Sequence, residues 1–471
     1  MKSCCCLISI LSIVGLKYIS IISANGIRLD QSFENLRLNP PKGSFQHNQQ
    51  ASSRTDTQTF HVVNEWKYLD FEYPTFVSRQ QAILKGDFIP RNNLPLGIDR
   101  HRNRLFLTTP RWKDGVPASL VTVPFPTKEI SPQVRPYPNW EAHSSPYNPD
   151  CTKLISVYRT AIDSQCNRLW LIDSGIVNAT INLNQVCLPK IVVYDLDTDQ
   201  MVVSFQLPSS QVKQDSLHSN IVVDIRQGRC EDAHAFVTDV WRFGIVVYSL
   251  ARHRSWRITN YNFYPNPAAS DFNIYGLNFQ WMDGVFGLSL SQKNRFLYFH
   301  PMASFKEFMV SADLLLDEFL WLNESINTSK YFVPIGDRGS NGQSSTSAIA
   351  RNGVMFYTQV QKDLIGCWDT SKPYIRENLG TLIDITNSSN TMLIQFPNDL
   401  KVDNEELQSL WVMSNRLPIY LYSQLDYGDI NFRILRADAE SVVANSVCNP
   451  IYLSTNTQNM AVISLKEGEC Y

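Results

Sequence analysis

The sequence predicts an all-β protein, a six-bladed β-propeller closed by its N-terminal strand. Three observations predict this fold. A short hydrophobic pair that follows a turn recurs six times, Phe, Trp and Tyr together make up 11% of the chain, and polar turns separate short strand-like runs. The six recurring segments are Asn103–Phe106, Asn167–Trp170, Asp232–Phe236, Asn294–Leu297, Asn352–Phe356 and Gln408–Trp411.

The spacing of these segments distinguishes a propeller from other repeat folds. Their last residues lie 64, 66, 61, 59 and 55 residues apart. A unit of this length holds three or four short strands, as a propeller blade does, whereas a solenoid of parallel strands repeats every roughly 20 to 30 residues. Each segment is expected to open the second strand of a blade. The run at residues 60–73 is expected to complete the last blade, which would remove exposed sheet edges.

The N-terminus has the features of a secretory signal peptide, predicted over residues 1–26. Lys2 precedes the short apolar stretch Leu7–Leu16, and cleavage fits after Ala24 or Gly26. This stretch is too short to span a bilayer, and no later segment approaches the ~20 apolar residues that a spanning helix needs. We therefore expect a secreted, extracellular protein.

The remaining chain divides into three parts. Residues 27–59 are polar and are expected to form a flexible leader, residues 60–450 to form the propeller, and residues 451–471 to form a C-terminal tail. The net charge is −2, so neither nucleic acid nor a membrane is expected as a partner. The oligomeric state is left open by the sequence.

The cysteines indicate disulfide bonds rather than a metal site. The chain has ten cysteines, three of them in the signal peptide, and the other seven show neither C-x-x-C pairs nor zinc-ligand spacing to histidine. Cys166 and Cys230 occupy first turns of neighbouring blades, while Cys151 and Cys187 lie at the opposite face of the second blade. The alternative Cys151–Cys230 would require other strand boundaries. We predict three disulfides, with Cys470 unpaired: Cys166–Cys230, Cys151–Cys187 and Cys367–Cys448.

Local motifs indicate glycosylation but no known catalytic machinery. Four Asn-x-Ser/Thr acceptors lie in polar connecting stretches, at Asn178, Asn323, Asn327 and Asn387. No G-x-S-x-G, Walker A, H-E-x-x-H or calcium-loop motif occurs. The glycine-rich run at Gly336–Gly342 lacks a βαβ context and is expected to be a loop. Neither a metal nor a cofactor is predicted.

Equivalent positions in the six units predict a site on the propeller axis. Three residues after each recurring segment the second strand should end, so these side chains should converge on one central mouth. They are Thr109, Asp173, Asp239, His300, Gln359 and Ser414, with Arg111, Trp112, Trp241 and Asn415 nearby. Convergent polar groups with aromatic walls suit a small aromatic ligand. Asp173, Asp239 and His300 are the members able to act as a catalytic base.

A purely structural interpretation remains open for the same residues. An aspartate after a strand often caps a turn by bonding the backbone, which applies equally to Asp173 and Asp239. His300 precedes a proline and suits a loop. Trp112 and Trp241 are also typical of packing between blades.

Seven segments, in order along residues 60–450, match one family of insect proteins. They are Glu65–Phe71, Pro110–Pro117, Pro136–Trp140, Ser156–Arg159, Cys166–Gly175, Ala235–Asp239 and Leu410–Arg416. Through them the chain resembles the insect yellow / major royal jelly protein family. The resemblance implies a secreted six-bladed propeller.

The resemblance also implies a range of roles. Members of this family are linked to cuticle pigmentation and melanin formation, convert dopachrome, bind biogenic amines in saliva, or serve as nutrients in royal jelly. In amine-binding members the Ser-Asn-Arg region contacts the ligand, which corresponds here to Asn415 and its neighbour Leu417. Leu417 is aliphatic where an aromatic side chain would stack on an indole. The chain has neither royal-jelly-like repeats nor a Met-rich tail, which argues against storage.

Three functional hypotheses follow. The first is a secreted, pigmentation-associated protein that binds a catecholamine, an indoleamine or dopachrome in the central pocket. The second is an isomerase that converts dopachrome to a dihydroxyindole. The third is a structural extracellular protein without a ligand.

Overall fold

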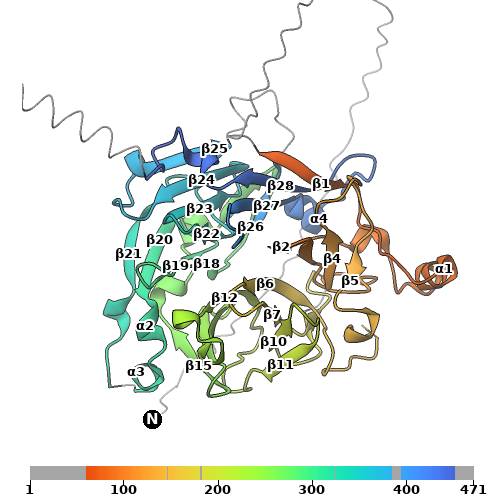
Figure 1. Ribbon diagram of the computed structural model, residues 1–471, viewed down its shortest axis with the longest axis horizontal. Coiled ribbons are helices and arrows are strands. Elements are labelled where there is room, and N and C mark those ends of the chain that lie inside the picture. The colour runs from red at the N-terminus through yellow and green to blue at the C-terminus, as the bar shows by residue number, and fades with distance from the viewer. Residues whose placement is uncertain (1–59, 146, 181–182, 324, 384–393, 451–471) are drawn as a thin grey trace, which may run out of the picture. The chain divides into compact units, whose positions relative to one another are not determined.

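The predicted all-β, six-bladed propeller is confirmed by the computed structural model, which describes residues 60–145, 147–180, 183–323, 325–383 and 394–450. Six four-stranded antiparallel sheets are arranged as blades around a central axis (Figure 1). The predicted signal peptide, leader and tail lie outside the described residues, as do Asn387 and Cys470.

Blades 1 to 3 follow one another along the chain, and the strands of each blade are named from the innermost to the outermost. Blade 1 consists of β2 (Gly97–His101), β3 (Arg104–Thr108), β4 (Leu120–Pro124) and β5 (Arg135–Pro136). Blade 2 consists of β6 (Val157–Asp163), β7 (Arg168–Asp173), β10 (Lys190–Asp195) and β11 (Met201–Gln206). Blade 3 consists of β12 (His218–Asp224), β13 (His234–Asp239), β14 (Gly244–Ser249) and β15 (Arg254–Thr259).

Blades 4 to 6 complete the ring. Blade 4 consists of β18 (Val285–Ser291), β19 (Phe296–Pro301), β20 (Lys306–Ser311) and β21 (Val333–Asp337). Blade 5 consists of β22 (Ser347–Ile349), β23 (Val354–Gln359), β24 (Leu364–Asp369) and β25 (Leu379–Ile383). Blade 6 consists of β26 (Pro397–Val402), β27 (Ser409–Asn415), β28 (Phe432–Asp438) and β1 (His61–Trp66).

The N-terminal strand closes the propeller, as the sequence predicts. β1 pairs antiparallel with β28, so the outermost strand of blade 6 comes from the opposite end of the folded chain. The indole N–H of Trp66 donates a hydrogen bond to the carbonyl of Pro132 (2.8 Å), which links this strand to the loop between β4 and β5 of blade 1. This pairing covers the outer edge of β28, which would otherwise be unpaired.

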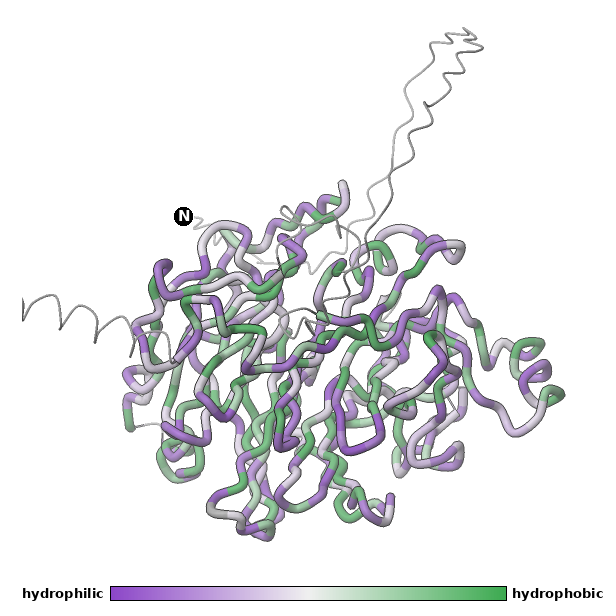
Figure 2. Tube along the Cα trace, turned by 45° about the horizontal axis from the view of Figure 1, so that its top comes forward, coloured by the Kyte–Doolittle hydropathy of each residue, from purple (hydrophilic) through white to green (hydrophobic). Residues whose placement is uncertain are grey.

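The recurring hydrophobic segments have a direct structural explanation. Each lies on the second strand of a blade, and its last residue is fully buried: Phe106, Trp170, Phe236, Leu297, Phe356 and Trp411. Hydrophobic residues fall mainly on the strands and hydrophilic residues on many connecting loops (Figure 2). The repeat therefore marks the position at which neighbouring blades bury their largest side chains against one another.

The propeller has two faces, the start face and the turn face. At the start face the six innermost strands β2, β6, β12, β18, β22 and β26 begin and the second strands end; at the turn face each innermost strand turns into the second. Two small hairpins belong to loops of the start face, β8 (Ile176–Val177) with β9 (Asn184–Gln185) and β16 (Asp271–Ile274) with β17 (Leu277–Gln280).

Helices are few in the described part of the chain. α1 (Phe76–Lys85) lies at the periphery of blade 1 (Figure 1), and α2 (Ala312–Leu315) and α3 (Glu318–Leu322) connect β20 to β21. α4 (Leu417–Tyr422) directly follows β27 at the start face. No helix among the described residues has the length and apolar character to cross a membrane.

The three predicted disulfides are present in the structure. Cys166–Cys230 joins the first turns of blades 2 and 3, Cys151–Cys187 joins two loops of blade 2, and Cys367–Cys448 ties β24 to the segment after β28. Because each bond closes a loop of 36 to 81 residues, each restricts the unfolded chain and thereby stabilises the propeller.

Four innermost strands have a β-bulge close to the start face. The register shifts between Val157 and Arg159, His218 and Asn220, Val285 and Gly287, and Pro397 and Asp399. A bulge leaves one residue out of the ladder and redirects its side chain. The four residues left out of the ladder are Tyr158, Ser219, Phe286 and Asn398. Tyr158 and Phe286 belong to the candidate functional site.

Candidate functional site

Aromatic side chains gather around the axis at the start face. Five of them are only partly buried and pack against the largest hydrophobic cluster formed by the described residues: Trp112, Trp241, Phe279, Trp281 and Phe286. They come from the loops after β3 and β13, from β17 and the loop after it, and from the bulge of β18. Partly exposed aromatic surfaces of this kind suit a planar ligand, because each ring can stack while its other side stays packed.

Asp283 lies among these rings, in the loop between β17 and β18. The indole N–H of Trp241 donates a hydrogen bond to its Oδ1 (2.9 Å). The residue as a whole is partly exposed, and burial of its carboxyl group raises the pKa to about 6. Asp283 is therefore a base that is mostly ionised at neutral pH and close to its protonation midpoint, as proton transfer requires.

The backbone fixes the position of Asp283. The next residue, Gly284, donates its N–H to Val240 O (2.9 Å) and accepts from Met302 N (2.9 Å). A Cβ added at Gly284 would come within 2.3 Å of the Phe243 ring, so only glycine fits there. The loop is thereby held against blades 3 and 4.

Two tryptophan–tyrosine pairs flank Asp283. The indole N–H of Trp112 donates to the Tyr158 hydroxyl, and the indole N–H of Trp281 donates to the Tyr422 hydroxyl. No described residue accepts the proton of either hydroxyl, so neither is used as a donor within the described structure. Tyr422 is exposed, whereas Tyr158 is buried beneath Trp112. Burial raises the pKa of both tyrosines, and the negative charge of Asp283 adds to the rise, so both stay protonated at neutral pH.

Arg159 occupies the axis beneath this group. It is fully buried and reaches from blade 2 to blade 6, where one Nη donates to Asn398 O (2.9 Å) and Asn398 Oδ1 (3.1 Å). Its guanidinium also lies 5.9 Å from the ring of Phe286 in blade 4. Gly97 leaves room for Arg159 to reach from blade 2 to blade 6. A Cβ at position 97 would crowd the Arg159 side chain at a distance of 3.3 Å.

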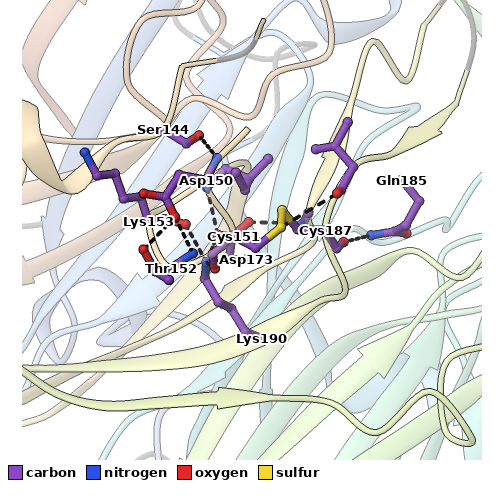
Figure 3. The surroundings of a disulfide bond; sticks show 12 residues. Ser144, Asp150, Cys151, Thr152, Lys153, Asp173, Gln185, Cys187 and Lys190 are labelled. Carbon is purple, nitrogen blue, oxygen red and sulfur yellow. Dashed lines mark hydrogen bonds and ion pairs between the residues drawn. A yellow bond between two sulfur atoms is a disulfide. The ribbon is translucent and has the colours of Figure 1, made fainter. Parts of the chain in front are cut away.

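Asp173 is placed by the structure next to the Cys151–Cys187 disulfide (Figure 3). Its carboxylate accepts hydrogen bonds from the backbone N–H groups of Ile155 (2.8 Å), Ser156 (2.8 Å) and Gly175 (3.1 Å), and Lys190 Nζ lies 3.5 Å away. These contacts hold together the loops at the end of β7, so the carboxylate has a structural use in the fold.

Asp239 is occupied in the same way. It accepts from the Ser216 hydroxyl (2.5 Å) and from the N–H groups of Leu217 and Arg242 (both 3.1 Å), and it forms an ion pair with Arg257 (2.9 Å). Every one of these partners belongs to the protein itself, so the described geometry offers no free oxygen of Asp239 to a ligand.

His300 lies inside blade 4 rather than at the surface. Its Nδ1 is 2.9 Å from Glu307, which also pairs with Arg338. Burial lowers the pKa of His300, so the imidazole is neutral. The side chain is fully buried and packs beside Gly287, where a Cβ would come within 2.1 Å of the ring. The structure thus does not bring His300 together with Asp283.

The expected ligand-binding residues fall into two groups. Trp112 and Trp241 belong to the aromatic group around Asp283. Four others are buried and lie apart from it: Arg111 donates to Val116 O and Pro117 O, Asn415 donates to Pro95 O, Leu417 begins α4 within the core, and Gln359 ends β23. The two tryptophans are therefore the predicted residues that could contact a ligand without rearrangement.

Asp283, Tyr158, Trp281 and Tyr422 were not singled out from the sequence. Asp283 precedes an innermost strand, whereas the equivalent positions of the six repeats lie at the ends of second strands. A usable signal was present in the run Phe279-Gln-Trp-Met-Asp283, which places two aromatic residues and an acid directly before a strand at the same face. Tyr158 could be recognised only through the bulge, which the sequence does not reveal.

Among the residues that the structure describes, no group of three His, Cys, Asp or Glu side chains is arranged to hold a metal ion. Of the four glycosylation acceptors, Asn178 and Asn323 are partly exposed and Asn327 is exposed.

The geometry at the start face suits proton transfer on a planar ring. A base with a pKa of about 6 lies beside two hydroxyl donors, and aromatic rings form the surrounding surface. Such a set can remove a proton from carbon and deliver hydrogen bonds to oxygens that gain negative charge.

Comparison with known proteins identifies close relatives. The sequence model of the major royal jelly protein family matches residues 155–448. The chain is 64% identical over 432 residues to a dopaminechrome tautomerase of Drosophila melanogaster, and the alignment covers 91% of each chain. It is 36% identical over 406 residues to the protein yellow of Drosophila pseudoobscura pseudoobscura, covering 84% of this chain and 70% of that relative.

Proposed function

Because the chain belongs to the yellow / major royal jelly protein family, we propose that it is a secreted tautomerase acting in melanin formation on dopaminechrome. The observation that carries this proposal is the partly exposed Asp283, hydrogen-bonded by Trp241 and flanked by the hydroxyls of Tyr158 and Tyr422. The relative of 64% identity is a dopaminechrome tautomerase, which supports the same choice.

The reaction needs only proton transfers. Dopaminechrome is a dihydroindole that carries two quinone carbonyls, and its dihydroxyindole isomer has the same atoms. Each of the two saturated ring carbons loses one proton, and each carbonyl oxygen gains one. No oxidant, reductant or leaving group is involved, so a base and hydrogen-bond donors suffice.

Each part of the site has a role in this scheme. The Asp283 carboxylate removes a proton from a saturated carbon of the five-membered ring. Tyr158 and Tyr422 donate hydrogen bonds to the carbonyl oxygens, which become phenolates as the ring aromatises. Trp112, Trp241 and Phe286 form the surface on which the flat ring stacks.

The proposal changes the order of the hypotheses drawn from the sequence. Binding without turnover was the first of these, and isomerisation was the second. The relationship to a dopaminechrome tautomerase and the ionisable Asp283 favour isomerisation. Asp173, Asp239 and His300 are then assigned to the fold, since protein groups already occupy them.

The test compares the rate of dopaminechrome loss, followed by absorbance, for the wild type and Asp283→Asn. We expect the wild type to exceed the spontaneous rate and Asp283→Asn to lower kcat by about 10²- to 10⁴-fold, the usual contribution of a general base. Asp271→Asn is the matched control, since Asp271 is an exposed acid of the adjacent β16–β17 hairpin.

Two results would contradict the proposal. Full activity in Asp283→Asn would remove Asp283 from the reaction. Saturable binding of dopaminechrome by the wild type, measured by calorimetry without any acceleration, would favour a sequestering protein instead.

A further inference from the structure

A small pocket at the start face is formed by loops of blades 1 and 2. Its volume is about 80 Å³, and its lining comes from the loop after β3, from the loop before β6 and from the hairpin β8–β9. None of the residues given a role in the proposed reaction belongs to this lining. The volume is far below the roughly 300 to 1,000 Å³ of pockets for drug-sized ligands, so an occupant has only a few heavy atoms.

Arg111 lines this pocket with an incomplete set of hydrogen bonds. Its residue is only 1% exposed. Its Nε donates to Val116 O (3.0 Å) and its Nη2 to Pro117 O (2.9 Å), whereas Nη1 has no hydrogen-bond partner among the described residues. Burial lowers the pKa of Arg111 to about 10, so the guanidinium is still positively charged at neutral pH. The pocket therefore contains a buried cation with an unused donor.

The protein does not neutralise this cation by a direct contact. Asp173 is the acid whose charge acts on Arg111, but three backbone N–H groups and Lys190 already hold its carboxylate. Asp114 belongs to the lining and is exposed to solvent. A buried charge without a partner is costly, and water satisfies the N–H groups without neutralising the charge. An anion in the pocket would do both.

The other charges of the lining limit the charge of this anion. Lys113 directs its ammonium toward α4, where it donates to Tyr420 O (2.8 Å) and lies 3.8 Å from the centre of the Tyr420 ring. Arg111 and Lys113 against Asp114 leave an excess of one positive charge among the lining residues. This excess suits a monovalent anion better than a multiply charged one.

Two asparagine side chains add donors to the lining. Asn178 directly follows β8 and is partly exposed, and Asn184 lies on β9 and is exposed. Each amide has two N–H groups, and a glycan attached to Asn178 would leave one of them in place. The backbone N–H of Asn178 also donates to Arg111 O (2.8 Å), so the loop after β3 and the hairpin β8–β9 already meet beside the pocket.

We propose that this pocket binds a small monovalent anion, a halide or a carboxylate of the size of acetate, between the Arg111 guanidinium and the amides of Asn178 and Asn184. The bound anion links the loop after β3 to the hairpin β8–β9 and thereby stabilises the folded protein. This site lies apart from the group around Asp283 and does not depend on the proposed reaction.

Thermal unfolding of the purified full-length protein in different sodium salts tests this site. Sodium gluconate is the reference, because gluconate is too large for the pocket, and sodium chloride or sodium acetate replaces it at constant sodium concentration. We expect a saturable rise in Tm of about 1–3 °C, as for a ligand that binds only the folded state. A rise with chloride alone identifies a halide site, and a rise with acetate alone identifies a carboxylate site.

Asn184→Asp places a negative charge in the pocket at an exposed position, and we expect it to abolish the rise in Tm. Asn278→Asp is the matched control, because Asn278 is an exposed asparagine on the second strand of the other start-face hairpin, β16–β17. Its Oδ1 accepts from the Asn273 amide (2.6 Å), a bond that a carboxylate keeps. The control should respond to the anions as the wild type does.

Equal rises in Tm for the wild type and Asn184→Asp would overturn the proposal, as would no rise with either anion. Wild-type crystals grown in sodium bromide and in sodium acetate give an independent measurement. Anomalous density of bromide, or acetate density, beside Arg111 Nη1 supports the proposal, whereas water alone at this position in both crystals contradicts it.

Discussion

At the scale of single residues, the hydrogen-bond partners of an acid decide whether it can take part in chemistry. Asp173 accepts three backbone N–H groups, and Asp239 is paired with Arg257. Asp283 accepts a single hydrogen bond, from an indole N–H, and its residue is partly exposed. All three lie at the same face, Asp173 and Asp239 at the ends of second strands and Asp283 in a loop, and residue type alone does not separate the structural acids from the reactive one.

Tyr158 is the donor whose contribution can be isolated most cleanly. Tyr158→Phe keeps the ring and its packing with Trp112 but removes the hydroxyl. We expect kcat for dopaminechrome to fall by about 10²-fold, the effect of losing one donor to a developing oxyanion, with little change in the melting temperature. The rate of dopaminechrome loss at saturating substrate measures it.

The matched control for Tyr158→Phe is Tyr261→Phe, because Tyr261 is largely exposed and lies outside the site. An unchanged kcat in Tyr158→Phe would show that the hydroxyl does not assist the reaction.

At the scale of elements, the innermost strands determine which side chains lie at the propeller axis. The bulges of β6 and β18 release Tyr158 and Phe286 from their ladders, and Gly97 of β2 leaves room for Arg159 to cross between them. The sequence indicates these strands by their hydrophobic pattern but carries no signal for the bulges, because a bulge depends on how two strands pair.

Gly97→Ala tests whether Gly97 is needed for the Arg159 side chain to reach from blade 2 to blade 6. An added Cβ would lie 2.7 Å from Thr108 Oγ1 and 3.3 Å from Arg159 Cδ. We expect the free energy of unfolding to fall by about 1–3 kcal/mol, as for other overpacked cores. Chemical denaturation measures the change.

Gly428→Ala provides the comparison, because the nearest atoms there belong to the exposed Asp426 side chain. Equal stability of the two variants would mean that β2 can shift to accept the methyl group and that Gly97 is not needed for the crossing.

At the scale of the whole molecule, the fold is the part most fully predictable from sequence. The buried last residues of the six recurring segments occupy one equivalent position on the second strands, so their spacing reports the blade length directly. The same strand boundaries led to two of the disulfides found in the structure, Cys166–Cys230 and Cys151–Cys187, and the third predicted pair, Cys367–Cys448, is also present. The site was less predictable from the sequence. Asp283 lies in the loop before an innermost strand, whereas the repeat points to residues at the ends of the second strands.

Closure of the ring by β1 is expected to control global stability. A variant that begins at Phe60 retains β1 and its pairing with β28, whereas a variant that begins at Tyr73 lacks both β1 and Trp66. We expect the first to unfold cooperatively at the melting temperature of the mature protein and the second to aggregate, since the edge of β28 is exposed. Scanning calorimetry with light scattering compares them, and cooperative unfolding of the shorter variant would contradict this role of β1.

The most direct measurement of the central claim, that Asp283 is the base of a tautomerase, is the pH dependence of kcat/KM for dopaminechrome. A base acts only when deprotonated, and the pKa of Asp283 is about 6. The wild type should therefore gain activity as the pH rises through about 6 and reach a plateau above it, after the spontaneous rate at each pH is subtracted. The account predicts that Asp283→Asn loses this rise along with most of the rate. A rise that persists unchanged in Asp283→Asn would assign the titration to another group and contradict the account.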